Sequence, residues 1–186
     1  MKSANVSHEE FEGLAMPLLD ALYNFARWLS RDQAEAEDLV QETFFKGLRG
    51  FDSFTPGSDF RAWMFRILRN TFLTSRTGLQ AKLTVQLDAE EEGSVGVTWE
   101  TPESLVLASA TREALQSAMN SLPLRYREVI LLCDVEEMKY QEIADVLSVP
   151  IGTVMSRLAR GRKMLRQVLA GERRVFAPAG KSRQPR

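Results

Sequence analysis

Two stretches of this chain repeat apolar residues at helical spacing, and the segment between them does not. Residues 8–78 and 103–170 show the helical period, whereas residues 79–102 contain acids, glycines and a proline with little apolar surface to bury. No stretch alternates as a β-strand does, and no internal repeat is present. The pattern predicts an all-α protein, with two small helical domains joined by a flexible acidic linker. We expect residues 171–186 to form a basic disordered tail.

Composition argues against several kinds of site. The 186 residues include one cysteine and one histidine, so an internal disulfide or a zinc site cannot form, and Cys-His or metal-dependent catalysis is disfavoured. We predict no cofactor, no metal and no enzymatic activity. The longest apolar run, Val129 to Cys133, is far too short to cross a bilayer, and the N-terminus lacks a signal-peptide pattern. We therefore expect a cytoplasmic protein.

Charge is distributed very unevenly along the chain. From Ile151 to the C-terminus there are ten Lys or Arg and one Glu, a net charge of +9. Because the whole chain carries −1, residues 1–150 carry −10. This asymmetry favours a polyanion as the partner of one part and a different partner for the rest.

The stretch YQEIADVLSVPIGTVMSRLARGRKML has the pattern of a helix-turn-helix. A short helix near 140–148 precedes a tight turn and a longer helix from about 151, and a buried helix before them makes the unit tri-helical. The outer face of the longer helix has small residues first and cations later, which suits entry into a DNA major groove. The candidate DNA-binding residues are Thr153, Met155, Ser156, Arg157, Ala159, Arg160 and Lys163. The alternative is a basic face that only contacts solvent.

The stretch GSDFRAWMFRILRNTFLTSR predicts a helix with a different nucleic-acid signature. Its predicted core face comprises Phe60, Trp63, Met64, Ile67 and Thr71. On the opposite face aromatic rings alternate with guanidinium groups, namely Arg61, Phe65, Arg66, Arg69, Phe72 and Arg76. Exposed rings can stack on unpaired bases while arginines hold phosphates. The alternative is that Phe65 and Phe72 pack against a neighbouring helix. Just before this helix, we expect a turn and a helix N-cap at Pro56, Gly57 and Ser58.

One helix earlier, DQAEAEDLVQETFFKGLRGF begins with Asp32 and Glu35 at capping-box spacing. Its predicted buried residues are Ala36, Val40, Phe44 and Leu48. Its outward face carries Asp38, Gln41, Glu42 and Phe45. DNA would repel this mostly acidic strip, whereas a protein partner could use it as an aromatic centre with a polar rim. The alternative is a solvated acidic face.

Three stretches together resemble a known family. AEDLVQETF, FDSFTPGSDFRAWMFRILRNT and YQEIADVLSVPIGTVMSRLARGRKML are similar, in order and spacing, to those of bacterial sigma-70 family RNA polymerase sigma factors of the extracytoplasmic-function (ECF) subfamily. The resemblance covers nearly the whole chain. It implies a region 2 domain at 8–78, a linker at 79–102 that passes near the polymerase active site, and a region 4 helix-turn-helix domain at 103–170.

The resemblance also implies function and partners. The acidic strip would dock on the clamp helices of core RNA polymerase, and region 4 would bind the flap and the minus-thirty-five element. The minus-ten element would be opened and held by Thr55, Pro56, Gly57, Ser58, Asp59, Arg61, Phe65, Arg66 and Arg69. Such a protein directs promoter recognition, DNA melting and transcription initiation of stress-response genes, under control of an anti-sigma factor and without membrane insertion.

Other functions remain open at this point. A sigma mimic that sequesters an anti-sigma factor would resemble the same domains, and a one-component helix-turn-helix repressor would share the C-terminal motif. Met155 and Ala159 depart from the residues that family members often carry, so the resemblance does not imply a particular promoter sequence.

Overall fold

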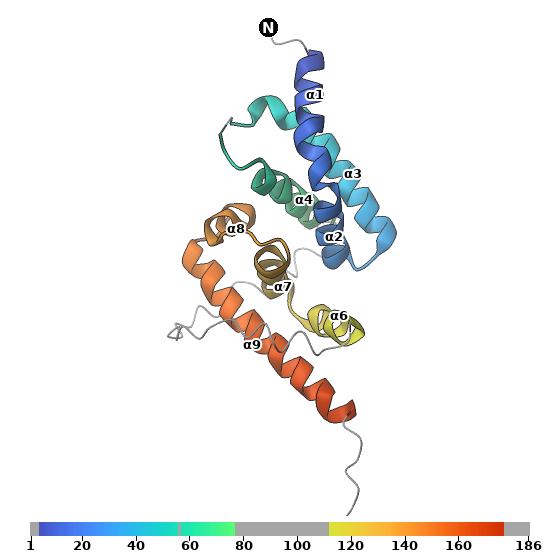
Figure 1. Ribbon diagram of the computed structural model, residues 1–186, viewed down its shortest axis with the longest axis vertical. Coiled ribbons are helices and arrows are strands. Elements are labelled where there is room, and N and C mark those ends of the chain that lie inside the picture. Colours follow the sequence, from blue (N-terminus) through green and yellow to red (C-terminus); the bar gives the residue numbers. More distant parts are fainter. Residues whose placement is uncertain (1–3, 56, 77–111, 177–186) are drawn as a thin grey trace, which may run out of the picture.

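The computed structural model describes residues 4–55, 57–76 and 112–176, and every regular element in these ranges is helical (Figure 1). The N-terminal unit contains α1 (Ala4–Ala15), the short turn η1 (Met16–Leu18), α2 (Leu19–Ser30), α3 (Gln33–Gly50), the short turn η2 (Phe51–Ser53) and α4 (Phe60–Arg76). The C-terminal unit contains α6 (Arg112–Ser121), α7 (Leu124–Ile130), the π-helical turn η4 (Leu131–Val135), α8 (Tyr140–Leu147) and α9 (Ile151–Phe176). The prediction of an all-α protein is confirmed.

The expected linker at 79–102 lies outside the described residues. The C-terminal boundary differs from expectation, because α9 continues to Phe176 and therefore includes six residues that we assigned to a disordered tail. The C-terminal unit also has four α-helices in its described part, where we predicted three. The additional helix, α6, lies against α9 and extends the unit's core.

The corner between α2 and α3 is determined locally. Arg31 ends α2 in the left-handed conformation, with φ 65°. Asp32 then caps α3, since its carboxylate accepts a hydrogen bond from the backbone N–H of Glu35 at 2.9 Å. The predicted inner face is confirmed in part, because Ala36 and Val40 are buried while two further residues, Phe44 and Leu48, are half-buried.

The start of α4 differs from the prediction. Asp59, and not Ser58, caps this helix, because its carboxylate accepts from the backbone N–H of Ala62 at 3.1 Å. The Ser58 hydroxyl instead donates to the carbonyl of Thr55 at 2.7 Å and closes the turn. Gly57 takes φ 90°, a conformation that a side chain disfavours. The turn itself is therefore where we predicted it, and the cap is one residue later.

In the C-terminal unit the helix-turn-helix is confirmed. Ser148 takes a left-handed conformation after α8, and the carbonyl of Pro150 accepts from the N–H groups of the first turn of α9. The inner residues Ile143, Leu147, Val154, Leu158 and Leu165 are all buried, as expected. Farther along α9, Gly161 faces α7 so closely that a Cβ would lie 3.0 Å from the Ile130 side chain.

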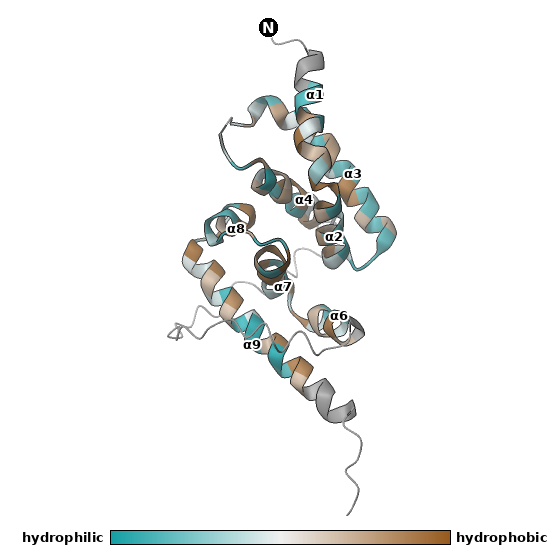
Figure 2. Cartoon of the chain, viewed as in Figure 1, coloured by the Kyte–Doolittle hydropathy of each residue, from teal (hydrophilic) through white to brown (hydrophobic). Residues whose placement is uncertain are grey.

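The two units pack against each other. Helix α4 is in contact with α2 and α3 within its own unit and with α8 of the other unit, and in Figure 1 α8 lies beside α4 while α9 forms the outer edge. Figure 2 shows hydrophobic and hydrophilic residues mixed along α3 and α9, as amphipathic helices require. Because α4 touches helices of both units, it has little solvent-facing surface.

Candidate promoter and polymerase interfaces

The outer face of α9 has the exposure that a DNA-reading helix needs. Among the predicted DNA-binding residues, Ala159 and Lys163 are exposed, whereas Thr153, Met155, Ser156, Arg157 and Arg160 are half-buried. Gly152, at the first turn, is also exposed, and a Cβ there would meet no atom within 4 Å. The Ser156 hydroxyl donates to the Thr153 carbonyl at 3.0 Å. The first two turns are therefore slim and polar.

The loop before α4 stands on a cluster of aromatic rings. Thr55, Gly57, Ser58 and Asp59 are exposed, and Pro56 lies outside the described residues. Beneath the loop, the ring centroids of Phe54 and Trp63 lie 5.3 Å apart, as do those of Phe54 and Phe60. These contacts hold the two ends of the loop on one rigid base. The structure thus presents the predicted loop to solvent.

The aromatic rings on α4 are not where we predicted them. Phe65 and Phe72 are 0% and 4% exposed, so the expectation that they face solvent is wrong and the packing alternative is right. The Phe65 ring lies 5.3 Å from that of Phe25 on α2. The buried residues of α4 are Ala62, Met64, Phe65, Leu68, Thr71 and Phe72. The core stripe is therefore rotated toward Phe65, because α2 and α8 cover a face that a wheel of α4 alone assigns to water.

The arginines on α4 have three different environments. Arg66 is exposed. Arg61 donates to the Glu136 carboxylate at 2.6 Å and to the Glu136 carbonyl at 2.7 Å. Arg69 donates through Nε to the Glu128 carboxylate at 2.8 Å. Two of the candidate DNA-binding arginines are thus engaged by the C-terminal unit in this arrangement.

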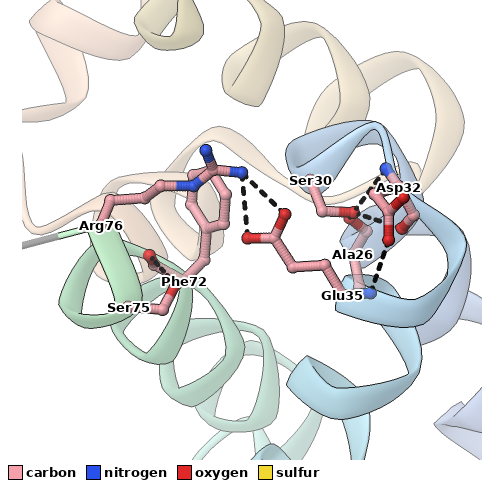
Figure 3. Close-up of polar contacts among 7 residues, drawn as sticks. All are labelled: Ala26, Ser30, Asp32, Glu35, Phe72, Ser75 and Arg76. Atoms are coloured by element: carbon pink, nitrogen blue, oxygen red, sulfur yellow. Dashed lines mark hydrogen bonds and ion pairs between the residues drawn. The ribbon is translucent and has the colours of Figure 1, made fainter.

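At the far end of α4, Arg76 contacts both α3 and a ring of its own helix (Figure 3). Its guanidinium lies 2.8 Å from the Glu35 carboxylate on α3 and over the ring of Phe72. Glu35 therefore uses its carboxylate to hold Arg76, while its backbone N–H is capped by Asp32. Close by, the Ser30 hydroxyl donates to the Ala26 carbonyl at 2.9 Å. Arg76 has a structural contact here that its position on the basic face did not suggest.

The acidic strip on α3 projects into solvent as predicted. Asp38, Gln41, Glu42 and Phe45 are all described as outward-facing by the sequence pattern, and Phe45 retains 54% of its accessible surface. Lys46 lies 3.3 Å from Glu42, and the Arg49 guanidinium lies 5.4 Å from the centre of the Phe45 ring. A large exposed aromatic residue within a polar rim is typical of a protein interaction surface.

Sequence reasoning missed four charged residues between the two units. Glu128 is 1% exposed, and burial raises its pKa although the nearby guanidinium groups of Arg69, Arg157 and Arg127 act in the opposite direction. Burial, followed by the nearby Arg31, lowers the pKa of Arg127 to about 10. The signal available in the sequence was a pair of charges directly before the apolar run VILLC, at positions that a core helix normally gives to apolar side chains.

Comparison with known proteins identifies the family. The family model described as sigma-70 region 2 matches residues 14–81, and that described as sigma-70 region 4 matches residues 112–165. The chain is 34% identical over 158 residues to the ECF RNA polymerase sigma factor SigW of Bacillus subtilis, a match that covers 81% of this chain and 83% of the relative. The chain belongs to the ECF sigma factors of the sigma-70 family. Our prediction from the three sequence motifs is thus confirmed.

Other relatives agree with this membership. The sigma factor is 38% identical over 151 residues to the ECF RNA polymerase sigma factor SigE of Mycolicibacterium smegmatis, a match that covers 81% of this chain and 58% of that relative's own length. It is 33% identical to the ECF RNA polymerase sigma factor EcfG of Rhodopseudomonas palustris, over 83% of this chain and 88% of that relative. These relatives are transcription initiation factors.

Solved structures resemble this sigma factor across both units. The sigma factor RpoE, in complex with the anti-sigma factor NepR from Bartonella quintana, has 32% sequence identity and a TM-score of 0.67, covering 87% of this chain and 98% of that one. CnrH in complex with the cytosolic domain of CnrY has 26% identity and a TM-score of 0.64, covering 91% and 96%. The fold of the sigma factor is therefore shared by both.

Two further observations concern the described residues alone. No helix within them combines the length and the apolar character needed to span a membrane. Within the same ranges, no three His, Cys, Asp or Glu side chains cluster closely enough to bind a metal ion.

Proposed function

We propose that this sigma factor acts without catalysis of its own, by binding core RNA polymerase and placing it on a promoter, where polymerase performs the chemistry. One observation carries the proposal: regions 2 and 4 occur in one chain and in family order, each with an exposed face of the chemistry its role requires. Two weak DNA contacts on one polymerase suffice, because tethering raises the effective concentration of the second. The site of action is the cytoplasm, where polymerase and promoter meet.

The polymerase contact is the acidic strip of Asp38, Gln41, Glu42 and Phe45. In this role Phe45 fills an apolar pocket on the clamp helices, and the carboxylates pair with cations around it. The exposed aromatic centre and its polar surroundings support this assignment. Region 4 makes a second contact with polymerase, at the flap.

The minus-ten contact combines the loop of residues 55–59 with the arginines of α4. An unpaired base enters the exposed loop, which offers polar groups to the edge of the base, and Arg61, Arg66 and Arg69 hold the strand's phosphates. The buried Phe65 ring supports the helix from below and does not stack on a base unless the units separate. A strand held in this way stays apart from its complement.

The minus-thirty-five contact is the face of α9 that begins at Gly152 and Thr153. The small first turn lets the helix approach the major groove, and Arg157, Arg160 and Lys163 then reach bases or phosphates. The exposed or half-buried state of every candidate residue supports this assignment. Met155 and Ala159 contribute apolar contact, which suits the methyl group of thymine.

An anti-sigma factor is the fourth partner in this proposal. Its support is the likeness, over 87% of this chain, to the sigma factor RpoE as it occurs with NepR. An inhibitor of this kind would keep the sigma factor from polymerase until a stress signal removes it.

Transcription with purified core polymerase tests the proposed function. We expect core polymerase alone to initiate at few defined sites on a random-sequence promoter library, and the added protein to produce transcripts that share two upstream elements. Where Arg160 meets a base, Arg160→Ala should weaken selection at the upstream element by about 1–3 kcal/mol and leave the downstream element intact. A protein that produces no transcripts but still binds an anti-sigma factor would be a sigma mimic. A protein that binds its operator equally well without polymerase would be a repressor.

A further inference from the structure

Two ion pairs join α4 to the C-terminal unit. Arg69 and Glu128 meet at 2.8 Å, and Arg61 and Glu136 meet at 2.6 Å. The carboxylates are almost completely buried, at 1% and 7% exposure, whereas the arginine side chains remain partly accessible, at 15% and 35%. Each pair has its cation on one unit and its anion on the other, so separation of the units breaks both.

The same guanidinium groups are required for DNA in the proposed function. An arginine that donates its N–H groups to a buried carboxylate cannot donate them to a phosphate at the same time. A carboxylate resembles a phosphate in charge and in having oxygen acceptors that fit the guanidinium fork. The contacts to Glu128 and Glu136 are therefore incompatible with contacts from Arg69 and Arg61 to a melted strand.

The arrangement also has an internal cost. In the described part of the chain, Nε and Nη1 of Arg127 are buried without a hydrogen-bond partner. Arg127 also lies near a second cation, Arg31, whose guanidinium donates to the Asn120 carbonyl across the units. Separation of the units would let water reach the Arg127 guanidinium and would relieve this repulsion. The packed state is thus held by the two ion pairs and opposed by Arg127.

The polymerase-binding strip remains accessible while the units are packed. Asp38, Gln41 and Glu42 project from α3 beside the exposed Phe45 ring in the arrangement that engages Arg61 and Arg69. Polymerase can therefore dock first. A partner that binds the separated units better than the packed ones shifts the equilibrium by its difference in affinity.

We propose that the packed arrangement is an autoinhibited state of this sigma factor, in which Glu128 and Glu136 occupy the arginines of α4 in place of DNA phosphates until polymerase separates the units. The proposal rests on the proposed minus-ten role of Arg61 and Arg69. It assigns to the chain itself a block that works without any anti-sigma factor.

A charge reversal at Glu136 tests the proposal in the full-length protein. Glu136→Arg places a cation against Arg61, whereas the control Glu137→Arg makes the same change of charge at the next residue, which is exposed. Affinity for a fluorescently labelled oligo-dT single strand is measured at fixed salt, and the radius of gyration is measured by small-angle X-ray scattering. We expect Glu136→Arg to enlarge the radius of gyration and to bind oligo-dT about tenfold more tightly than Glu137→Arg does.

The reciprocal exchange separates the ion pair from other effects. In the double variant Arg61→Glu with Glu136→Arg the pair is restored in reverse, so the compact radius of gyration should return. Circular dichroism and thermal unfolding establish that each variant is folded. If Glu136→Arg misfolds, Arg61→Glu alone serves as the scattering test, because it places two carboxylates in contact and should open the protein.

The possible results distinguish this proposal from the proposed function. If Glu136→Arg stays compact and matches Glu137→Arg in DNA affinity, the autoinhibited state is rejected while promoter-directed transcription stands on its own test. If Glu136→Arg expands without a gain in affinity over its control, the DNA role of Arg61 is rejected, and the inhibition with it. Expansion together with the gain supports both.

Discussion

Gly47 shows how much one missing side chain matters in the N-terminal unit. A Cβ at this position would lie 2.9 Å from the Met64 sulfur and 3.1 Å from the Phe11 ring, and both of those side chains are buried. Helix α3 can therefore approach α4 and α1 closely only because position 47 has no side chain. We expect Gly47→Ala to lower the free energy of unfolding by about 1–2 kcal/mol, because the strain exceeds the gain in helix propensity.

Gly13 provides the matched control for this change. It is also a helical glycine, in α1, and a Cβ there would meet no atom within 4 Å. Gly13→Ala should raise the free energy of unfolding by about 0.5–1 kcal/mol, because alanine loses less backbone entropy on folding. Chemical denaturation of the two variants measures both values. Equal effects would mean that position 47 is not tightly packed.

Single residues also explain part of what sequence spacing alone did not reveal. Glu35 has the spacing of a capping box, which predicts a role in the α3 cap. In the structure its carboxylate holds Arg76, which comes from a helix 41 residues later in the chain. A cap is a local interaction that sequence spacing can predict, whereas an ion pair between distant residues depends on how the helices pack.

At the scale of the element, α3 divides its two faces as its sequence predicts. Ala36 and Val40 face the core, while Glu42 and Phe45 face solvent, because the apolar residues of this helix follow one helical stripe. The prediction from a single helix was successful here, since only one side of α3 is covered by other described helices.

The exposed face of α3 gives a prediction about polymerase binding. Glu42→Lys replaces a carboxylate of the acidic strip by a cation and should weaken the affinity for core polymerase about tenfold, or ~1.4 kcal/mol. The fold should be unaffected because Glu42 is exposed, and its one described ion pair is with Lys46 on the same helix. Binding is measured by fluorescence anisotropy, with the exposed Glu12→Lys on α1 as a control of equal charge change. A comparable loss in the control would show that only net charge matters.

Helix α4 illustrates the opposite case at the same scale. Its sequence contains two apolar stripes, and the wheel assigned the stripe of Phe65 and Phe72 to solvent. Contacts with α2 and α8 bury that stripe, so Phe65 is fully covered. A helical wheel places residues around one axis, but it carries no information about how many neighbours the helix has.

At the scale of the whole molecule, the boundary between the units contains an ionisable group that should couple stability to pH. Burial raises the pKa of Glu128 above its ordinary value of 4.5. The folded protein then binds this proton more readily than the unfolded chain does. The contribution of Glu128 to stability is therefore fully present below the unfolded pKa and is lost as pH rises through the folded pKa.

Denaturant unfolding over a pH series measures this coupling. Glu128→Gln cannot titrate, so the difference in unfolding free energy between the wild type and this variant should change between about pH 4 and about pH 7, with the wild type losing stability relative to the variant as pH rises. Glu137→Gln, an exposed neighbour, should run parallel to the wild type. A constant difference between the wild type and Glu128→Gln would exclude the coupling.

The sequence by itself determined the helices, the turn before α9, the exposed acidic strip and, through three motifs in order, the family. These features arise from residues close together in the chain, because helical periodicity, capping and turn conformation are local properties. Only the tertiary structure decided that Phe65 is buried and that Arg61 and Arg69 face Glu136 and Glu128. Those partners lie 59 to 75 residues away in the chain. Their meeting depends on the packing of one unit on the other, which no local pattern encodes.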